Sequence, residues 1–185
     1  MLQNSATVPL ELDRYGKEMV RLNEPSRADH AGYDVIVRGM PNEANCVIIK
    51  TDEFTPPSKF FQGTKGELKR ADFVIIANTQ NKKMIVCIEL KARKETSSTA
   101  EVIQQLKGAQ CVIGYCQQIA QQFWGETSLL KDYEYRFVTV RDISISKKTS
   151  KTKSDLDALH DTPENMLKIN SPNNLYLKQL ISSPS

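Results

Sequence analysis

The stretch that decides the fold covers residues 70–92 and reads RADFVIIANTQNKKMIVCIELKA. Within it, two apolar and largely β-branched runs at 73–77 and 84–88 flank a polar tetrad, Thr-Gln-Asn-Lys, at 79–82. Runs of this kind on either side of a short polar segment are typical of a β-hairpin with a tight turn. The sequence therefore predicts two antiparallel strands here.

The register of this hairpin places two acidic side chains together. If the middle two residues of the tetrad form the turn, Asp72 lies opposite Glu89, and opposed residues share a face with Cβ atoms about 5 Å apart. Because side chains alternate between faces, Lys91 lies on that face as well, and Leu90 points the other way.

Two adjacent carboxylates repel each other, which raises one pKa unless a cation lies between them. A hard divalent cation such as Mg²⁺ takes oxygen ligands from one or two carboxylates, so Asp72 and Glu89 are suited to hold one. Lys91 could orient and help deprotonate a water molecule there, or stabilise charge on a phosphate. The pattern predicts metal-assisted phosphodiester hydrolysis. The competing interpretation is a solvated pair at a strand end, because short motifs also recur by chance.

Asp72, followed after sixteen residues by Glu89-Leu90-Lys91, resembles the Asp…Glu-x-Lys signature of the PD-(D/E)xK nuclease superfamily. Ala71 stands where the superfamily name places Pro, a position that varies among its members. The resemblance implies an α/β fold of the restriction-endonuclease type, with an αβββαβ core and a mixed central sheet flanked by helices. It also implies that Asp72, Glu89 and the Leu90 backbone carbonyl hold Mg²⁺, for which Mn²⁺ could substitute.

A glutamate from the first helix often joins the metal site in this superfamily. Segment 9–23 predicts such a helix, ended by Pro25. Its apolar residues at helical spacing are Val8, Leu12, Tyr15, Met19 and Leu22. Glu11 and Glu18 both lie on the flank of this stripe, and we choose Glu18 as the additional metal ligand. The alternative is a surface glutamate on an amphipathic helix.

A long helix is predicted at Thr99–Trp124, with Thr99 as its N-cap and an apolar stripe that would cover the sheet. Some members of the superfamily carry a glutamine and then a tyrosine on this helix, near the metal. Gln105 or Gln110 with Tyr115 is a loose match to that pattern, and Gln105 is the residue we expect near the site. The alternative is ordinary hydrophilic helix surface.

Length and composition are those of a soluble globular protein, with 185 residues, 39% hydrophobic and 25% charged. We expect one domain over residues 1–185. The absence of a run of about 18 apolar residues and of a signal-peptide pattern predicts a cytoplasmic protein with no membrane partner. The four cysteines lack Cys-x-x-Cys spacing and there are only two histidines, which disfavours a disulfide framework, a zinc site or a histidine metal site.

Basic residues gather on both sides of the predicted site. Those expected to bind nucleic acid are Lys59, Lys65, Lys69, Arg70, Arg93 and Lys94, and a second cluster comprises Lys147, Lys148, Lys151 and Lys153. Such residues would neutralise backbone phosphates, although each could also be an ordinary solvated side chain. Phe60 and Phe61 could stack on bases or wedge a duplex, but we expect them to pack against the sheet.

The remaining segments complete the predicted layout. Strands are expected at Tyr33–Arg38, 45–51 and 133–145, with an extended loop at 54–67, a core over about 9–145, a mobile basic loop at 146–154 and a C-terminal extension at 155–185. Within that extension we expect a helical turn at 155–160 and, at 166–181, a hairpin or a strand with a short helix.

The sequence thus favours a Mg²⁺-dependent DNA endonuclease of restriction-like, homing or defence type, acting on DNA as a homodimer or higher symmetric oligomer. A Holliday-junction resolvase is the nearest alternative. A non-catalytic nucleic-acid-binding or assembly module that keeps the nuclease fold is another. A protein-interaction domain with no nucleic-acid role stays open as well.

Overall fold

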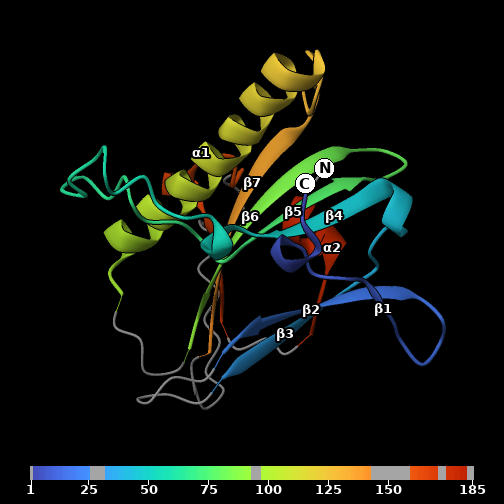
Figure 1. Ribbon diagram of the computed structural model, residues 1–185. Coiled ribbons are helices and arrows are strands. Elements are labelled where there is room, and N and C mark those ends of the chain that lie inside the picture. The colour runs from blue at the N-terminus through green and yellow to red at the C-terminus, as the bar shows by residue number, and fades with distance from the viewer. Residues whose placement is uncertain (1, 26–31, 93–96, 143–158, 171–173, 183–185) are drawn as a thin grey trace.

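The computed structural model describes residues 2–25, 32–92, 97–142, 159–170 and 174–182. Its architecture is mixed α/β, with two mixed sheets, one long helix and one short one (Figure 1). The predicted basic loop at 146–154, Arg93 and Lys94, and most of the predicted helical turn at 155–160 lie outside the described residues. In the part of the chain that is described, no helix is long and apolar enough to cross a membrane.

The larger sheet has five strands in the order β4-β5-β6-β7-β8. Their bounds are β4 Cys46–Lys50, β5 Phe73–Asn78, β6 Lys83–Lys91, β7 Glu134–Arg141 and β8 Leu167–Asn170. Strands β4, β5 and β6 are antiparallel, whereas β6, β7 and β8 are parallel to one another. Phe73 pairs with Ile88, which confirms the hairpin register predicted from the sequence.

Helix α1, Thr99–Trp124, covers one face of this sheet (Figure 1). The apolar side chains of α1, including Leu106 and Ile113, pack against Ile85, Cys87 and Phe137 of the sheet. The predicted helix bounds are confirmed. The N-cap is Ser98 and not Thr99, because Ser98 and Glu101 form a reciprocal capping box.

A second sheet, in the order β1-β2-β3-β9, packs on the opposite face of the larger one (Figure 1). Its strands are β1 Glu11–Leu12, β2 Glu18–Glu24, β3 Tyr33–Arg38 and β9 Asn174–Tyr176, and α2, Leu177–Ile181, follows β9. Apolar residues of β2 and β3 join those of β5, β6 and α2 in one core. The larger sheet is therefore buried between α1 and this second sheet. The C-terminal extension forms strands and a short helix, one of the two outcomes expected.

The predicted helix at 9–23 is wrong, because β1 and β2 form a hairpin there. Gly16 adopts a left-handed φ of +70° in the turn, and the Asp13 carboxylate accepts hydrogen bonds from the amides of Tyr15 and Lys17. This turn interrupts the chain where a helix would have to continue. The same segment fits two apolar patterns, one at helical spacing and one with every second residue buried. The structure follows the second pattern, which buries Val20 and Leu22. The first helix of the expected core is consequently absent from this segment.

Four short 3-10 helices complete the described elements, η1 Asn4–Ala6, η2 Glu43–Asn45, η3 Thr51–Glu53 and η5 Pro163–Asn165. The segment from residue 54 to residue 70 is a loop, which contains the loop predicted at 54–67 and extends beyond it. Phe60 and Phe61 do not pack against the sheet, because they are 86% and 53% exposed. That expectation was wrong.

Candidate active site

Two hydrogen bonds hold Asp72 in place, one from β6 and one from η3. Asp72 directly precedes β5, and its Oδ2 atom accepts a hydrogen bond of 2.7 Å from the amide of Leu90 on β6. The Asp72 carbonyl accepts a second bond, of 2.9 Å, from the amide of Thr51 in η3. The carboxyl group is therefore held against the β6 backbone, beside Glu89, as the predicted register requires.

Glu89 and Lys91 lie near the end of β6 on the face that α1 covers. Ile85 and Cys87, which share this face, belong to the core beneath the helix. The Lys91 ammonium lies 2.6 Å from Oε1 of Glu89, and both side chains are buried. The second carboxylate oxygen of Glu89, Oε2, is buried without a hydrogen-bond partner among the described residues. One oxygen of this carboxylate is thus left for a further ligand.

Burial makes ionisation of both acids unfavourable. It raises the pKa of Asp72 to about 7; the Leu90 amide lowers that pKa, and the nearby Glu24 carboxylate raises it. Burial and then the charge of Asp72 raise the pKa of Glu89 well above its ordinary value, against the opposing effect of Lys91. When both acids ionise, their negative charges repel each other in a site of low dielectric, and a divalent cation would relieve this repulsion.

The sequence analysis missed Glu24, the last residue of β2. Glu24 is 5% exposed, and its charge raises the pKa of both Asp72 and Glu89. Glu24 follows Val20 and Leu22 at a spacing of two residues, so a strand pattern would have placed it at the buried strand end. That signal was hidden by the helical interpretation of the same residues.

Glu18 lies at the opposite end of β2 from Glu24, about 20 Å away along the strand. Its charge raises the pKa of Cys46, at the start of β4, and the site lies beyond the other end of that strand. The prediction that Glu18 is the additional acid was tied to a helix that does not form. In the structure, Glu24 takes the position next to Asp72 and Glu89.

The parallel pairing of β6 with β7 adds two polar residues to the site. Thr139 is the register partner of Glu89, and Arg141 is the partner of Lys91. The Thr139 hydroxyl is buried and lacks a hydrogen-bond partner in the described part of the chain. Arg141 donates to the carbonyl of Ser97, just before α1. This register depends on long-range packing and could not be derived from the sequence.

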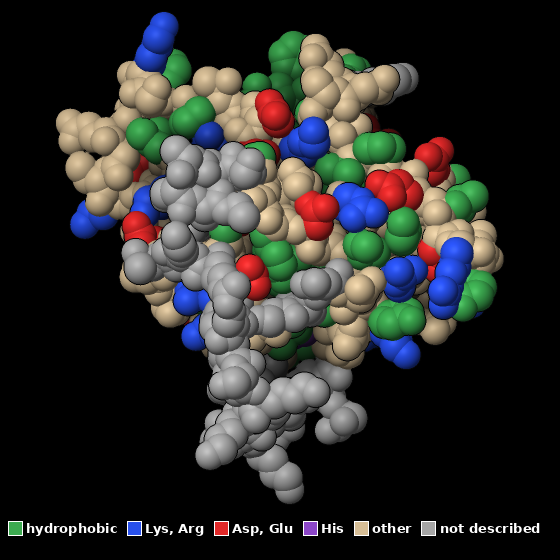
Figure 2. Space-filling view, turned by 90° about the horizontal axis from the view of Figure 1, so that it is seen from below, with side chains coloured by type: hydrophobic (Ala, Val, Ile, Leu, Met, Phe, Trp, Pro, Cys, Tyr) green, Lys and Arg blue, Asp and Glu red, His purple; other side chains and the backbone are tan. Residues whose placement is uncertain are grey.

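The predicted nucleic-acid-binding residues divide into three groups. Lys59 and Lys65 are exposed, whereas Lys69 is paired with Glu101 at 3.2 Å and Arg70 lies over the ring of Phe54. Arg93 and Lys94 lie outside the described residues. Figure 2 shows basic and acidic side chains interspersed over one face of the molecule, with no single basic patch gathered there.

Gln105 lies on α1 and is half-buried, with a buried Oε1 atom that has no hydrogen-bond partner among the residues described. Gln110 is exposed, and the exposed Tyr115 packs edge-on against Phe54, with ring centroids 5.3 Å apart. Of the three helix residues, Gln105 is therefore the one with a buried polar side-chain atom. Among the described residues no hydrogen bond joins it to Asp72 or Glu89, so its role stays a prediction.

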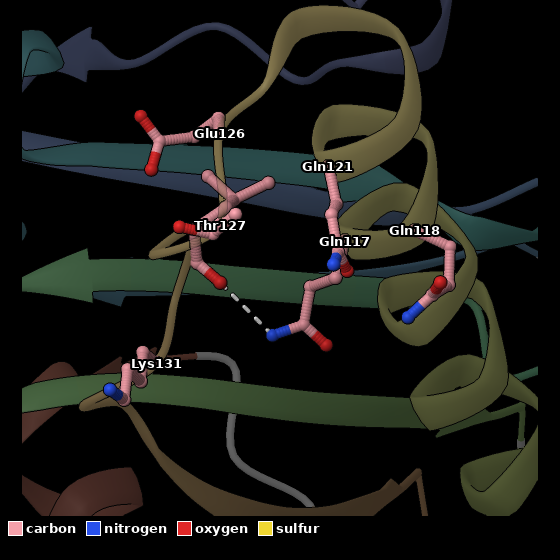
Figure 3. A pocket seen from close by; sticks show the side chains of 7 residues that line it. Gln117, Gln118, Gln121, Glu126, Thr127 and Lys131 are labelled. Carbon is pink, nitrogen blue, oxygen red and sulfur yellow. Dashed lines mark hydrogen bonds between the residues drawn. The ribbon is translucent and has the colours of Figure 1, made fainter.

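A polar cavity of about 230 Å³ lies near the other end of α1 (Figure 3). It is lined by Gln117, Gln118, Gln121, Glu126, Thr127, Leu129 and Lys131. Figure 3 shows the Gln117 side chain turned toward the segment after the helix, where it donates to the Leu129 carbonyl at 3.1 Å. Gln117 lies about 27 Å along the helix from Thr99, so this cavity is separate from Asp72 and Glu89.

Within the described residues, no group of three or more His, Cys, Asp or Glu side chains is arranged to hold a metal ion. The acids that the structure brings together are Asp72 and Glu89, with the charge of Glu24 acting on both. No protein-family model matches the chain, and no curated protein or solved structure matches it either. The function is therefore argued from this geometry.

Proposed function

We propose that the chain is a Mg²⁺-dependent DNA endonuclease that hydrolyses phosphodiester bonds. The observation that carries this proposal is the convergence of Asp72, Glu89 and Lys91 at one end of the β5–β6 hairpin. A buried pair of acids beside a lysine is costly for stability, and such groups are concentrated at functional sites. The Asp…Glu-x-Lys resemblance supports the same chemistry.

In this proposal, Asp72, Glu89 and the Leu90 carbonyl hold the cation. Three features of the site fit a hard divalent ion: the free Oε2 atom of Glu89, the raised pKa of both acids, and an all-oxygen donor set. When bound, Mg²⁺ would supply a Lewis acid for the charge on the phosphodiester. Mn²⁺ prefers the same oxygen ligands and would substitute.

Lys91 contributes the positive charge that the chain itself provides. Its ammonium is fixed by Glu89 at 2.6 Å, where its positive charge would stabilise a phosphate oxygen or orient the attacking water. A donor held in place before the substrate arrives stabilises developing charge without reorganisation. Lys91 is therefore the residue whose loss should reduce cleavage most without removing a metal ligand.

The finer fold belongs to the same proposal. In this proposal the order β4, β5, β6, α1, β7 would correspond to the βββαβ part of a restriction-endonuclease-like core, and the β1–β2 hairpin would stand in place of the expected first helix. One site per chain can cut only one strand at a time, so we include a homodimer or higher symmetric oligomer. Resolution of Holliday junctions uses the same chemistry and differs in substrate only.

Cleavage of supercoiled plasmid with Mg²⁺, Mn²⁺ or EDTA tests the proposal. Lys91→Met should reduce the rate at least about a hundredfold, the scale of losing one preorganised charge-stabilising donor. Lys83→Met is the matched control, because Lys83 lies on the same strand and is exposed at its other end. Equal rates for the two variants, or equal cutting in EDTA, would contradict the assignment.

A further inference from the structure

The loop of residues 54–70, called the 54–70 loop below, stands apart from the layered core. Figure 1 shows this loop projecting from the molecule beside the first part of α1. It carries Phe60 and Phe61, which are 86% and 53% exposed, and it leads directly to Asp72. Single exposed apolar residues are common, but two adjacent exposed phenylalanines on a projecting loop, together called the aromatic tip below, point to a contact.

Hydrogen bonds hold the aromatic tip in a defined conformation. The amides of Phe60 and Phe61 both donate to the Pro57 carbonyl, at 2.9 and 3.1 Å. Further along, the Glu67 carboxylate accepts bonds from the amides of Gly63 and Lys65, at 3.0 and 2.8 Å. These hydrogen bonds form turns on both sides of the two rings, so the backbone that carries the exposed rings is ordered.

Close backbone packing fixes the base of the loop to α1. A Cβ atom at Gly108 of α1 would lie 1.7 Å from the Lys69 carbonyl, and one at Gly66 would lie 2.5 Å from the Gln104 side chain. Gly108 thus permits a backbone contact that any side chain would block, whereas Gly66 has a left-handed φ of +84°, which favours glycine. The loop is positioned by the helix that also covers Glu89, so its tip keeps a set distance from the site.

The charge of the loop indicates its partner. Lys59, Lys65, Lys69 and Arg70 against Glu67 give residues 54–70 a net charge of +3, which equals that of the whole chain. The rest of the chain therefore has a net charge of zero. Within the loop, Lys59 adjoins the exposed rings and Lys65 is exposed, whereas Lys69 is paired with Glu101. Positive groups together with aromatic side chains are the combination that binds single-stranded nucleic acid, because every base offers a π-face.

We infer that the 54–70 loop binds unpaired bases, with Phe60 and Phe61 stacking on them while Lys59 and Lys65 contact the adjacent phosphates. The inference rests on the proposed nuclease function and names its substrate class as DNA with unpaired or displaced bases. Phe61 precedes Asp72 by eleven positions in the sequence, so the two residues are at most about 37 Å apart. This is about one turn of B-DNA, so tip and site can contact one substrate.

Fluorescence anisotropy in EDTA, where no cleavage is expected, tests the inference. The probes are a short duplex with a central unpaired bubble and the same duplex fully paired. The double variant Phe60→Ala, Phe61→Ala should bind the bubble about tenfold or more weakly and the paired duplex within about twofold of wild type. Phe123→Ala is the matched control, since Phe123 is 74% exposed at the end of α1, and it should change neither affinity.

The lysines give an independent measurement. Lys59→Gln with Lys65→Gln should weaken binding to both probes alike and reduce the salt dependence by about one phosphate contact per residue. The inference is overturned if the double phenylalanine variant loses affinity equally for both probes or not at all. It is also overturned if Phe123→Ala gives the same loss. Sedimentation showing that the wild type self-associates and the double variant does not would assign the tip to a contact between copies.

The two proposals fail in different ways. Aromatic-dependent binding of the bubble without any metal-dependent cutting would contradict the nuclease and leave the base-binding loop standing. Metal-dependent cutting lost in Lys91→Met, with bubble binding unaffected by the double phenylalanine variant, would do the reverse. A chain that binds neither probe contradicts both.

Discussion

The substitution Asp72→Asn distinguishes the effect of the buried acid on protein stability from its proposed role in binding a metal ion. The amide has the shape of the carboxylate and can still accept the hydrogen bond from Leu90, but it removes one of the buried negative charges. Without metal at pH 8, the substitution should stabilise the protein, because it removes the penalty for burying an ionised carboxylate and also its repulsion with Glu24 and Glu89. A stabilising change at a supposed active site is expected when the site is assembled for function.

The size of the stabilisation expected for Asp72→Asn follows from the pKa of Asp72. A rise from 3.8 to about 7 corresponds to on the order of 4 kcal/mol of lost stability once Asp72 is ionised. The hydrogen bond to a neutral acceptor is weaker by about 1 kcal/mol, which leaves a gain of about 2 to 3 kcal/mol for the variant. For a chain of this length, that gain corresponds to a rise in Tm of roughly 5 to 10 °C.

The same pKa shift determines the direction in which the stability of the protein changes with pH. Folded Asp72 keeps its proton to a higher pH than the unfolded chain does, so the stability of the wild type falls as pH rises from about 4 to about 7. The variant should lack the part of this decline that Asp72 causes, whereas the part due to buried Glu89 should remain. Below pH 4 the carboxyl is protonated in both states, and the difference between wild type and variant should be small.

Urea unfolding at pH 5 and pH 8, in EDTA and in Mg²⁺, measures these effects. Mg²⁺ at about 100 times its Kd should stabilise the wild type by about 2.7 kcal/mol and the variant much less. Asp132→Asn is the control, because the Asp132 side chain is 75% exposed, and it should stay within about 0.5 kcal/mol of wild type. A variant less stable than wild type in EDTA at pH 8, or stabilised equally by Mg²⁺, would refute the reasoning.

Two further substitutions test the packing around the site. Gly108→Ala should destabilise the protein by about 1 to 3 kcal/mol in urea unfolding, because the new Cβ would overlap the Lys69 carbonyl. Gly114→Ala, in the same helix with no described atom within 4 Å, should be neutral or stabilising by up to about 1 kcal/mol, and equal losses would contradict the close approach. Thr139→Val should leave stability unchanged or raise it by about 1 kcal/mol, because the hydroxyl it removes is buried without a partner in the described chain. A loss above about 1 kcal/mol would show that Thr139 does have a partner.

Local patterns in the sequence were sufficient for the hairpin and the long helix. The polar tetrad fixed the register that pairs Phe73 with Ile88, and that register places Asp72 beside Glu89. The helix at Thr99–Trp124 was predictable because its apolar stripe is long and regular. In both cases the information lies within one continuous stretch of chain.

Longer-range features could not be read in the same way. The apolar residues around Met19 fit the spacing of a helix as well as that of a strand. The turn at Gly16, with its left-handed backbone, favours the two strands. The exposure of Phe60 depends on how the 54–70 loop packs on α1. The placement of Arg141 beside Lys91 depends on the parallel pairing of distant strands. Each of these needs the tertiary structure.

The central claim is that Asp72, Glu89 and Lys91 form a metal-dependent phosphodiesterase centre. The most direct test is the rate of nicking of supercoiled plasmid by wild type and Glu89→Gln, each with Mg²⁺ and with EDTA. The account predicts cutting by the wild type in Mg²⁺ alone and none by the variant, with both proteins folded by circular dichroism. Cutting by Glu89→Gln at the wild-type rate, or no cutting of any DNA by the folded wild type in Mg²⁺ or Mn²⁺, would contradict it.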